Sequence, residues 1–222
     1  MYTITLGDKA YSSWSMRGWL LLDAFGLPYR EEAVPMYSDA FTTMAATRAP
    51  ARSVPQIAWT EGGRERRVWD TLAIAETLAE RHPEAGIWPA DPDLRAGARV
   101  LAAQMHAGFG GFRAGAPMNL HRHAEPLQSP TPEMQEGIER LEELWAWALA
   151  AAGGPWLCGA AFCAADAFAV PYAFRLTGYA LGSGRSAGYI ARLQSHPSVA
   201  RWVEAAEADP RRMARYDDVR QA

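Results

Sequence analysis

The sequence contains few of the residues that mark several protein classes. It has only two cysteines, Cys158 and Cys163, and they do not form a C-x-x-C pair. Two thiols cannot build a disulfide framework or a metal site made of thiolate ligands. We therefore expect both cysteines to be buried as small apolar residues, in a reducing compartment.

Long apolar runs and a strong charge imbalance are missing as well. No run approaches the ~20 apolar residues that cross a bilayer, and Met1–Thr5 lacks the basic-then-apolar pattern of a signal peptide. The net charge is −3, which favours neither nucleic acid nor an anionic membrane as a partner. We expect a soluble, cytoplasmic protein.

The 222 residues, 49% of them hydrophobic, suffice for one large domain or two small ones. The N-terminal part alternates short apolar runs with helical periodicity, which predicts an α/β unit of order βαβαββα. Its strands are expected at 2–6, 29–34, 54–59 and 66–69, and its helices at 14–25, 38–47 and 72–80.

A Pro-rich stretch at 83–92 follows and is the predicted linker between a domain at 1–82 and one at 93–222. The second domain has helical periodicity throughout. Its helices are expected at 94–112, 134–149, 162–179, 189–195 and 197–208, and the charged residues 211–222 are expected to be loose. The segment 162–179 is apolar nearly all round, broken by Asp166 and Arg175, as in a helix at the centre of a bundle.

Three hydroxyls, those of Ser12, Ser13 and Ser15, crowd the junction of the first strand and helix. The first turn of a helix leaves backbone N–H groups free, so an anionic ligand can bind there. The same serines also suit a plain helix cap. Whether these serines bind a ligand or only cap the helix depends on which other residues the fold places beside them.

Four motifs along the whole chain resemble the cytosolic glutathione S-transferase superfamily. Ser12–Arg17 is similar to the S-x-x-x-x-R turn of serine-type (zeta and tau) members, and Ser53–Ile57 is similar to the family's loop whose proline is cis. Asp70–Ile74 is similar to the family's (E/D)-S-x-A-I turn, and Phe162–Phe168 is similar to the capping motif of its central C-terminal helix. The resemblance implies a thioredoxin-like N-terminal domain followed by a helical C-terminal bundle, that is, α/β plus all-α.

The resemblance also implies roles for individual residues. Ser12 would stabilise the thiolate of glutathione, with Ser13 and Ser15 as competitors, and Arg17 would support this turn without touching the ligand. Glutathione itself would be held by Val54, Pro55, Asp70 and Thr71. Arg52 would supply the charge for its glycyl carboxylate, where the family often has Gly-Lys.

The electrophile would lie in an apolar pocket lined by Trp14, Met105, Phe109, Phe112 and Met118. Stripes at helical spacing more often form core, so for any one of these residues packing in the core is the better explanation. Asp166 forms half of a capping box, whereas Cys163 replaces the usual hydroxyl with a weaker acceptor.

The function implied is a glutathione transferase in which the thiolate adds to a small electrophile, with glutathione as co-substrate and no metal. A homodimer and a role in detoxification are implied by the resemblance alone. The alternatives are a zeta-like cis–trans isomerase, against which Trp14 stands where zeta enzymes carry Cys, and a non-catalytic glutathione- or ligand-binding protein on the same fold.

Overall fold

The computed structural model describes residues 1–127 and 129–219. Its N-terminal part is a mixed four-stranded sheet of order β2-β1-β3-β4. β1 pairs parallel with β2 and antiparallel with β3, and β3 pairs antiparallel with β4. The strands are β1 (Tyr2–Leu6), β2 (Tyr29–Ala33), β3 (Gln56–Glu61) and β4 (Arg64–Trp69).

Three helices connect these strands in the predicted order βαβαββα, which the structure confirms. They are α1 (Ser13–Asp23), α2 (Asp39–Thr47) and α3 (Thr71–Arg81). α1 and α3 pack against each other, and the apolar residues Ile4 and Ile57, which face each other in the register of β1 and β3, are fully buried. The N-terminal unit is thus thioredoxin-like, with its strands and helices in the order that the periodicity predicts.

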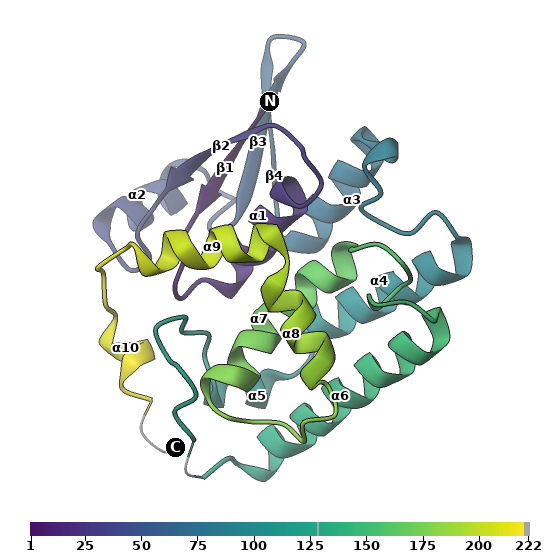
Figure 1. The fold of residues 1–222 in the computed structure, drawn as a ribbon. Coiled ribbons are helices and arrows are strands. Elements are labelled where there is room, and N and C mark those ends of the chain that lie inside the picture. The colour runs from purple at the N-terminus through teal and green to yellow at the C-terminus, as the bar shows by residue number, and fades with distance from the viewer. Residues whose placement is uncertain (128, 220–222) are drawn as a thin grey trace.

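The remaining chain is helical, and Figure 1 shows it as a layer beneath the sheet with α9 lying across the N-terminal unit. After the short turn η1 (Pro83–Ala85), the helices are α4 (Pro92–Ala107), α5 (Gly110–Gly115), α6 (Pro132–Ala152), α7 (Ala164–Gly178), α8 (Ala187–Ser195), α9 (Pro197–Glu207) and α10 (Ala214–Asp217). The domain bounds at 82 and 93 remain a prediction. No helix in the described residues is both long and apolar enough to cross a membrane.

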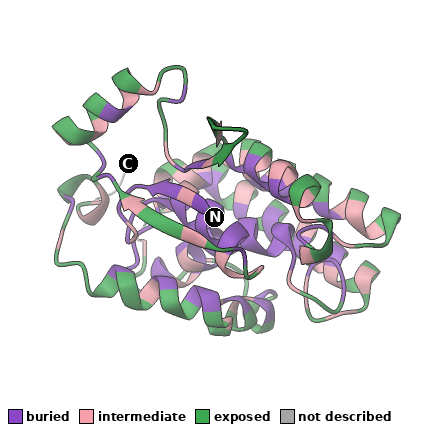
Figure 2. Ribbon diagram, turned by 90° about the horizontal axis from the view of Figure 1, so that it is seen from above, coloured by how far each residue is buried: buried purple, intermediate pink, exposed green. Residues whose placement is uncertain are grey.

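Burial follows the layers: buried residues gather in the middle of the molecule, and exposed residues lie on the outer faces of the helices (Figure 2). α7 is buried along most of its length and contacts α1, α4 and α8. The prediction of a central helix is therefore confirmed. Both cysteines are free and buried, also as predicted.

One predicted helix is wrong in its extent. The apolar stripe over 94–112 is divided into α4 and α5, because Phe109 adopts a left-handed conformation with φ 60°. A Cβ on Gly108 would lie 2.6 Å from the Gln104 carbonyl oxygen, so this position accepts only glycine without a shift of the backbone. Helical spacing continued through the break, and periodicity alone could not reveal it.

The first turn of α7 depends on Asp166, which is fully buried. Its carboxylate accepts hydrogen bonds from the Cys163 N–H at 2.9 Å, the Leu157 N–H at 3.0 Å and the Tyr189 hydroxyl at 2.7 Å. Asp166 therefore joins the start of α7 to the preceding loop and to α8.

We expect Cys163→Ser to raise the stability of the protein, because a hydroxyl is a stronger acceptor than a thiol for the free N–H groups at the start of α7. A gain of about 0.5–1 kcal/mol corresponds to a rise in Tm of a few degrees for a chain of this length. A thermal melt measures it. An unchanged or lower Tm would show that the buried sulfur contributes more by packing than its replacement gains by capping.

Candidate active site

A cavity of about 500 Å³ opens at the N-terminus of α1. We call it the α1 cavity. Its walls are the turn at residues 11–14, parts of the segment after β2, the loop before β3, α5 with the loop that follows it, one residue of α7, and residues 215–216. The cavity therefore lies where the sheet unit and the helical region meet, which is a usual place for a small-molecule site.

The three serines of the turn differ in what their hydroxyls do. Ser12 is the N-cap of α1: its Oγ accepts from the Ser15 N–H at 3.2 Å and donates to Ser15 Oγ at 2.8 Å. Ser15 is fully buried, accepts from the Gly7 N–H at 2.9 Å and does not line the α1 cavity. Ser15 is thus part of the packing beneath the turn.

Ser13 lines the cavity beside Ser12, and its hydroxyl has a different partner. Ser13 Oγ accepts a hydrogen bond of 3.2 Å from Nη2 of Arg175, which lies on α7 and is 4% exposed. Burial lowers the pKa of Arg175 to about 10, and the nearby Arg17 and Arg113 lower it as well. The sequence shows Arg175 as a charge in an apolar helix, but it does not show that Arg175 contacts Ser13.

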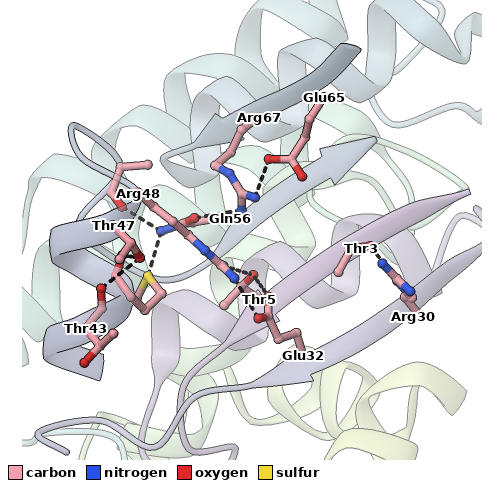
Figure 3. Close-up of polar contacts among 12 residues, drawn as sticks. Thr3, Thr5, Arg30, Glu32, Thr43, Thr47, Arg48, Gln56, Glu65 and Arg67 are labelled. Atoms are coloured by element: carbon pink, nitrogen blue, oxygen red, sulfur yellow. Dashed lines mark hydrogen bonds and ion pairs between the residues drawn. The ribbon is translucent and has the colours of Figure 1, made fainter. Parts of the chain in front are cut away.

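The loop before β3 forms another wall through Ser53 and Val54. The Val54–Pro55 bond is cis, as the resemblance implied. Gln56 holds this loop from the sheet: its amide nitrogen donates to the carbonyl oxygens of Ala51 (2.9 Å) and Ser53 (2.8 Å), and its oxygen accepts from Arg67 (3.1 Å). Figure 3 shows Gln56 with its contact to Arg67, together with the contacts of Arg48 to Thr5 and Glu32 on the same sheet face. Gln56 therefore positions the backbone that borders the cavity.

Asp70 and Thr71 begin α3 but do not line the α1 cavity. Asp70 is the N-cap of α3 and accepts from the Leu72 N–H at 2.9 Å, while Thr71 is fully buried. His106 of α4 covers both: its Nε2 lies 3.2 Å from Asp70 Oδ2, and its Nδ1 lies 3.4 Å from Thr71 Oγ1. Burial lowers the pKa of His106, although Asp70 opposes this shift.

The five residues expected to line the electrophile pocket divide into two groups. Trp14 and Met118 line the α1 cavity. Met105, Phe109 and Phe112 do not: Met105 and Phe112 are buried in the core, and Phe109 packs edge-on against Tyr172 with ring centroids 5.5 Å apart. These three residues pack in the interior, as the alternative explanation for them expects.

The two remaining arginines of the predicted site lie outside the cavity. Arg52 is exposed and is not among the lining residues. Arg17 is 1% exposed; it donates to the Met105 carbonyl oxygen at 3.0 Å, and its guanidinium lies 4.8 Å from the centre of the Trp14 ring. Arg17 thus ties the turn of α1 to the end of α4.

The C-terminal segment is ordered against this site, so the prediction of a loose tail is wrong for residues 211–219. The Tyr11 hydroxyl donates to Asp217 at 3.1 Å and accepts from the Met213 N–H at 3.2 Å. The Tyr216 and Tyr37 hydroxyls lie 3.0 Å apart. Residues 220–222, which the same prediction covers, lie outside the described part.

The charges along the wall have one sign. Arg113, Arg175 and Arg215 line the α1 cavity, and no Asp or Glu among the described residues does. Among residues 1–127 and 129–219, no three His, Cys, Asp or Glu side chains gather as a metal site requires. A site with several guanidinium groups and hydroxyls suits an anionic ligand.

The family comparison matches residues 11–81 to the model described as glutathione S-transferase, N-terminal domain. No curated protein matches the chain significantly.

Solved structures resemble the whole chain. A glutathione transferase homologue from Burkholderia gl BGR1, with bound glutathione, is similar over 94% of this chain and 99% of its own, with 21% identity and a TM-score of 0.69. Glutathione transferase Omega 1C from Trametes versicolor is similar over 99% and 98%, with 18% identity and a TM-score of 0.71. FzlA from C. crescentus is similar over 98% of each chain, with 21% identity and a TM-score of 0.70.

These likenesses cover both the sheet unit and the helices that follow, at identities that show the fold alone. The family model adds the match in sequence, and it spans the turn with the serines, the loop before β3 and α3. Residues 11–81 therefore match the N-terminal domain of glutathione S-transferases, and the chain as a whole has the fold of the glutathione transferases that it resembles.

Proposed function

We propose that this protein is a glutathione transferase that adds the glutathione thiolate to a small electrophile, with a serine hydroxyl stabilising the thiolate. The observation that carries the proposal is the α1 cavity, in which serine hydroxyls and the Val54 loop border one space. The similar structure from Burkholderia holds bound glutathione, which supports the same ligand here.

The chemistry required is ionisation of a thiol. A free thiol has a pKa of ~8.5, so little thiolate exists at neutral pH. A hydroxyl that donates to the sulfur, and the positive end of α1, both favour the anion. The thiolate then attacks an electrophilic carbon and forms a sulfur–carbon bond. In a substitution the leaving group departs with the electron pair of the broken bond, and in an addition the electron pair of the broken π bond takes up a proton from water.

The rest of glutathione would extend from this point along the Val54 backbone. Val54 lines the cavity, and its N–H and C=O suit pairing with an extended peptide. The γ-glutamyl end would lie at Asp70 and Thr71, at the N-terminus of α3. Because His106 covers both residues, it must withdraw before they can bind this end. Arg52 and Pro55 remain proposed contacts.

The double variant Ser12→Ala/Ser13→Ala tests the proposal, because it removes both cavity hydroxyls. We expect the thiol of bound glutathione to have a pKa about 1–2 units higher than in the wild type, since a hydrogen bond to a charged group contributes about 1.5–3 kcal/mol. The ultraviolet thiolate band, followed against pH, measures it. Ser195→Ala, on α8, is the control. An unchanged thiol pKa would refute the role of serine.

Two alternatives remain within the same fold. A zeta-like isomerase, in which the thiolate adds transiently, keeps the same turn of serines and Arg17. A non-catalytic binding protein would be retained on glutathione resin and would turn over no electrophile. A homodimer, a cytoplasmic location and a role in detoxification are further proposals that rest on the resemblance; sedimentation of the purified protein tests the first.

A further inference from the structure

The hydroxyls of Ser12 and Ser13 are not equivalent donors. The Ser12 proton is directed to Ser15 Oγ at 2.8 Å, and the oxygen accepts from the Ser15 N–H. Donation from Ser12 to a ligand would break the first of these bonds. The Ser13 hydroxyl accepts from Arg175 and has no acceptor for its own proton among the hydrogen bonds of the described residues. Ser13 can therefore donate into the cavity without losing a contact.

Arg175 is an unusual group to find beneath such a hydroxyl. It is 4% exposed, Nη1 donates to the Pro171 carbonyl oxygen at 3.1 Å, and Nε has no hydrogen-bond partner among residues 1–127 and 129–219. A buried charge costs several kcal/mol unless an opposite charge and hydrogen bonds offset the lost solvation. In the described part of the chain, no carboxylate forms an ion pair with Arg175.

The other groups around Arg175 add to its need for an anion. Arg17 of α1 and Arg113 of α5 repel it. The guanidinium lies 5.5 Å from the centre of the Tyr172 ring. The position therefore carries uncompensated positive charge at the wall of a cavity.

We propose that Ser13, and not Ser12, donates to the glutathione sulfur, and that Arg175 is the positioning residue that supplies the stabilising positive charge through Ser13. The inference rests on the proposed function, because it needs glutathione in the α1 cavity. The Arg175 N–H donates to Ser13 Oγ, and the Ser13 O–H donates to the thiolate. The thiol proton passes to water, and the negative sulfur offsets the buried charge.

A polarised chain of this kind strengthens the second hydrogen bond, because a hydroxyl that accepts from a cation is a better donor. It also gives Ser12 a separate task, the cap of α1, which its contacts with Ser15 already show. The two serines thus divide the roles that sequence could not separate.

The thiolate band of bound glutathione, followed against pH in the full-length protein, tests the proposal. Ser13→Ala and Arg175→Gln should each raise the pKa of the bound thiol by about 1–2 units. Arg175→Lys, which keeps a cation, should restore part of the shift. If Arg175 acts through Ser13, the double variant should show no larger shift than Ser13→Ala alone.

Arg192→Gln on α8 is the matched control, because Arg192 also donates to a backbone carbonyl oxygen, that of Pro155, but does not line the α1 cavity. It should leave the thiol pKa within a few tenths of a unit. An equal shift in this control, additive shifts in the double variant, or a shift in Ser12→Ala without one in Ser13→Ala would each overturn the proposal.

Calorimetric titration with glutathione separates this inference from the function on which it rests. Failure of the wild type to bind glutathione refutes the proposed function. Unchanged binding with an unchanged thiol pKa in Ser13→Ala refutes only the roles proposed for Ser13 and Arg175. If Arg175→Gln does not fold, Arg175→Lys and Ser13→Ala carry the comparison.

Discussion

Replacing Asp166 by Ala is expected to lower the free energy of unfolding by about 3–5 kcal/mol. The change leaves three buried donors, the Leu157 and Cys163 N–H groups and the Tyr189 hydroxyl, without their acceptor, and each lost partner costs about 1–3 kcal/mol. The three donors come from the loop before α7, its N-cap and α8. Denaturant unfolding followed by circular dichroism measures the loss.

Asp91→Ala is the matched control for this prediction. Asp91 is also an N-cap that accepts two backbone N–H groups, both at 2.9 Å, but it is exposed, so water replaces the lost acceptor. We expect a loss of about 1 kcal/mol. Equal losses in the two variants would show that Asp166 contributes only as a helix cap and not as a junction of three segments.

Gly18→Val is expected to destabilise the protein by about 3 kcal/mol and to weaken glutathione binding. A Cβ at position 18 would lie 2.5 Å from Cγ and 2.8 Å from Cβ of Pro55, whose ring has little room to yield. The cost arises because α1 packs directly on the loop that carries Val54. Displacement of that loop moves one wall of the α1 cavity, which titration with glutathione would detect.

The control here is Gly188→Ala on α8, where an added Cβ meets no atom within 4 Å. It should stabilise the protein by a few tenths to about 1 kcal/mol, because alanine favours the helix. If Gly18→Val unfolds no more readily than the wild type, the contact with Pro55 is looser than the structure shows.

Local patterns predicted most of the fold. The strands and helices of residues 1–82 follow from apolar periodicity, and the turn of serines follows from its place between β1 and α1. These features depend on neighbours in sequence. The break at Gly108 depends on a single backbone conformation within a continuous apolar stripe, so the pattern of residue types could not show it.

The site was predictable only where its residues are close in sequence to a recognisable turn. Ser12 and Val54, which two such turns indicate, both line the α1 cavity. The partner of Ser13 is 162 residues away on another helix, and such a pairing requires the tertiary structure. His106 was missed for the same reason. It contacts Asp70 from α4, and no pattern in the sequence indicates that these two residues meet.

The segment that follows α9 has a consequence for the order in which the protein is made. Residues 11–14 and the Val54 loop are synthesised before Arg175, Arg215 and Tyr216, which complete the same cavity. A nascent chain that has folded its sheet therefore still lacks part of the binding wall. The site is finished only after Tyr216 has been synthesised, when its hydroxyl can first meet that of Tyr37.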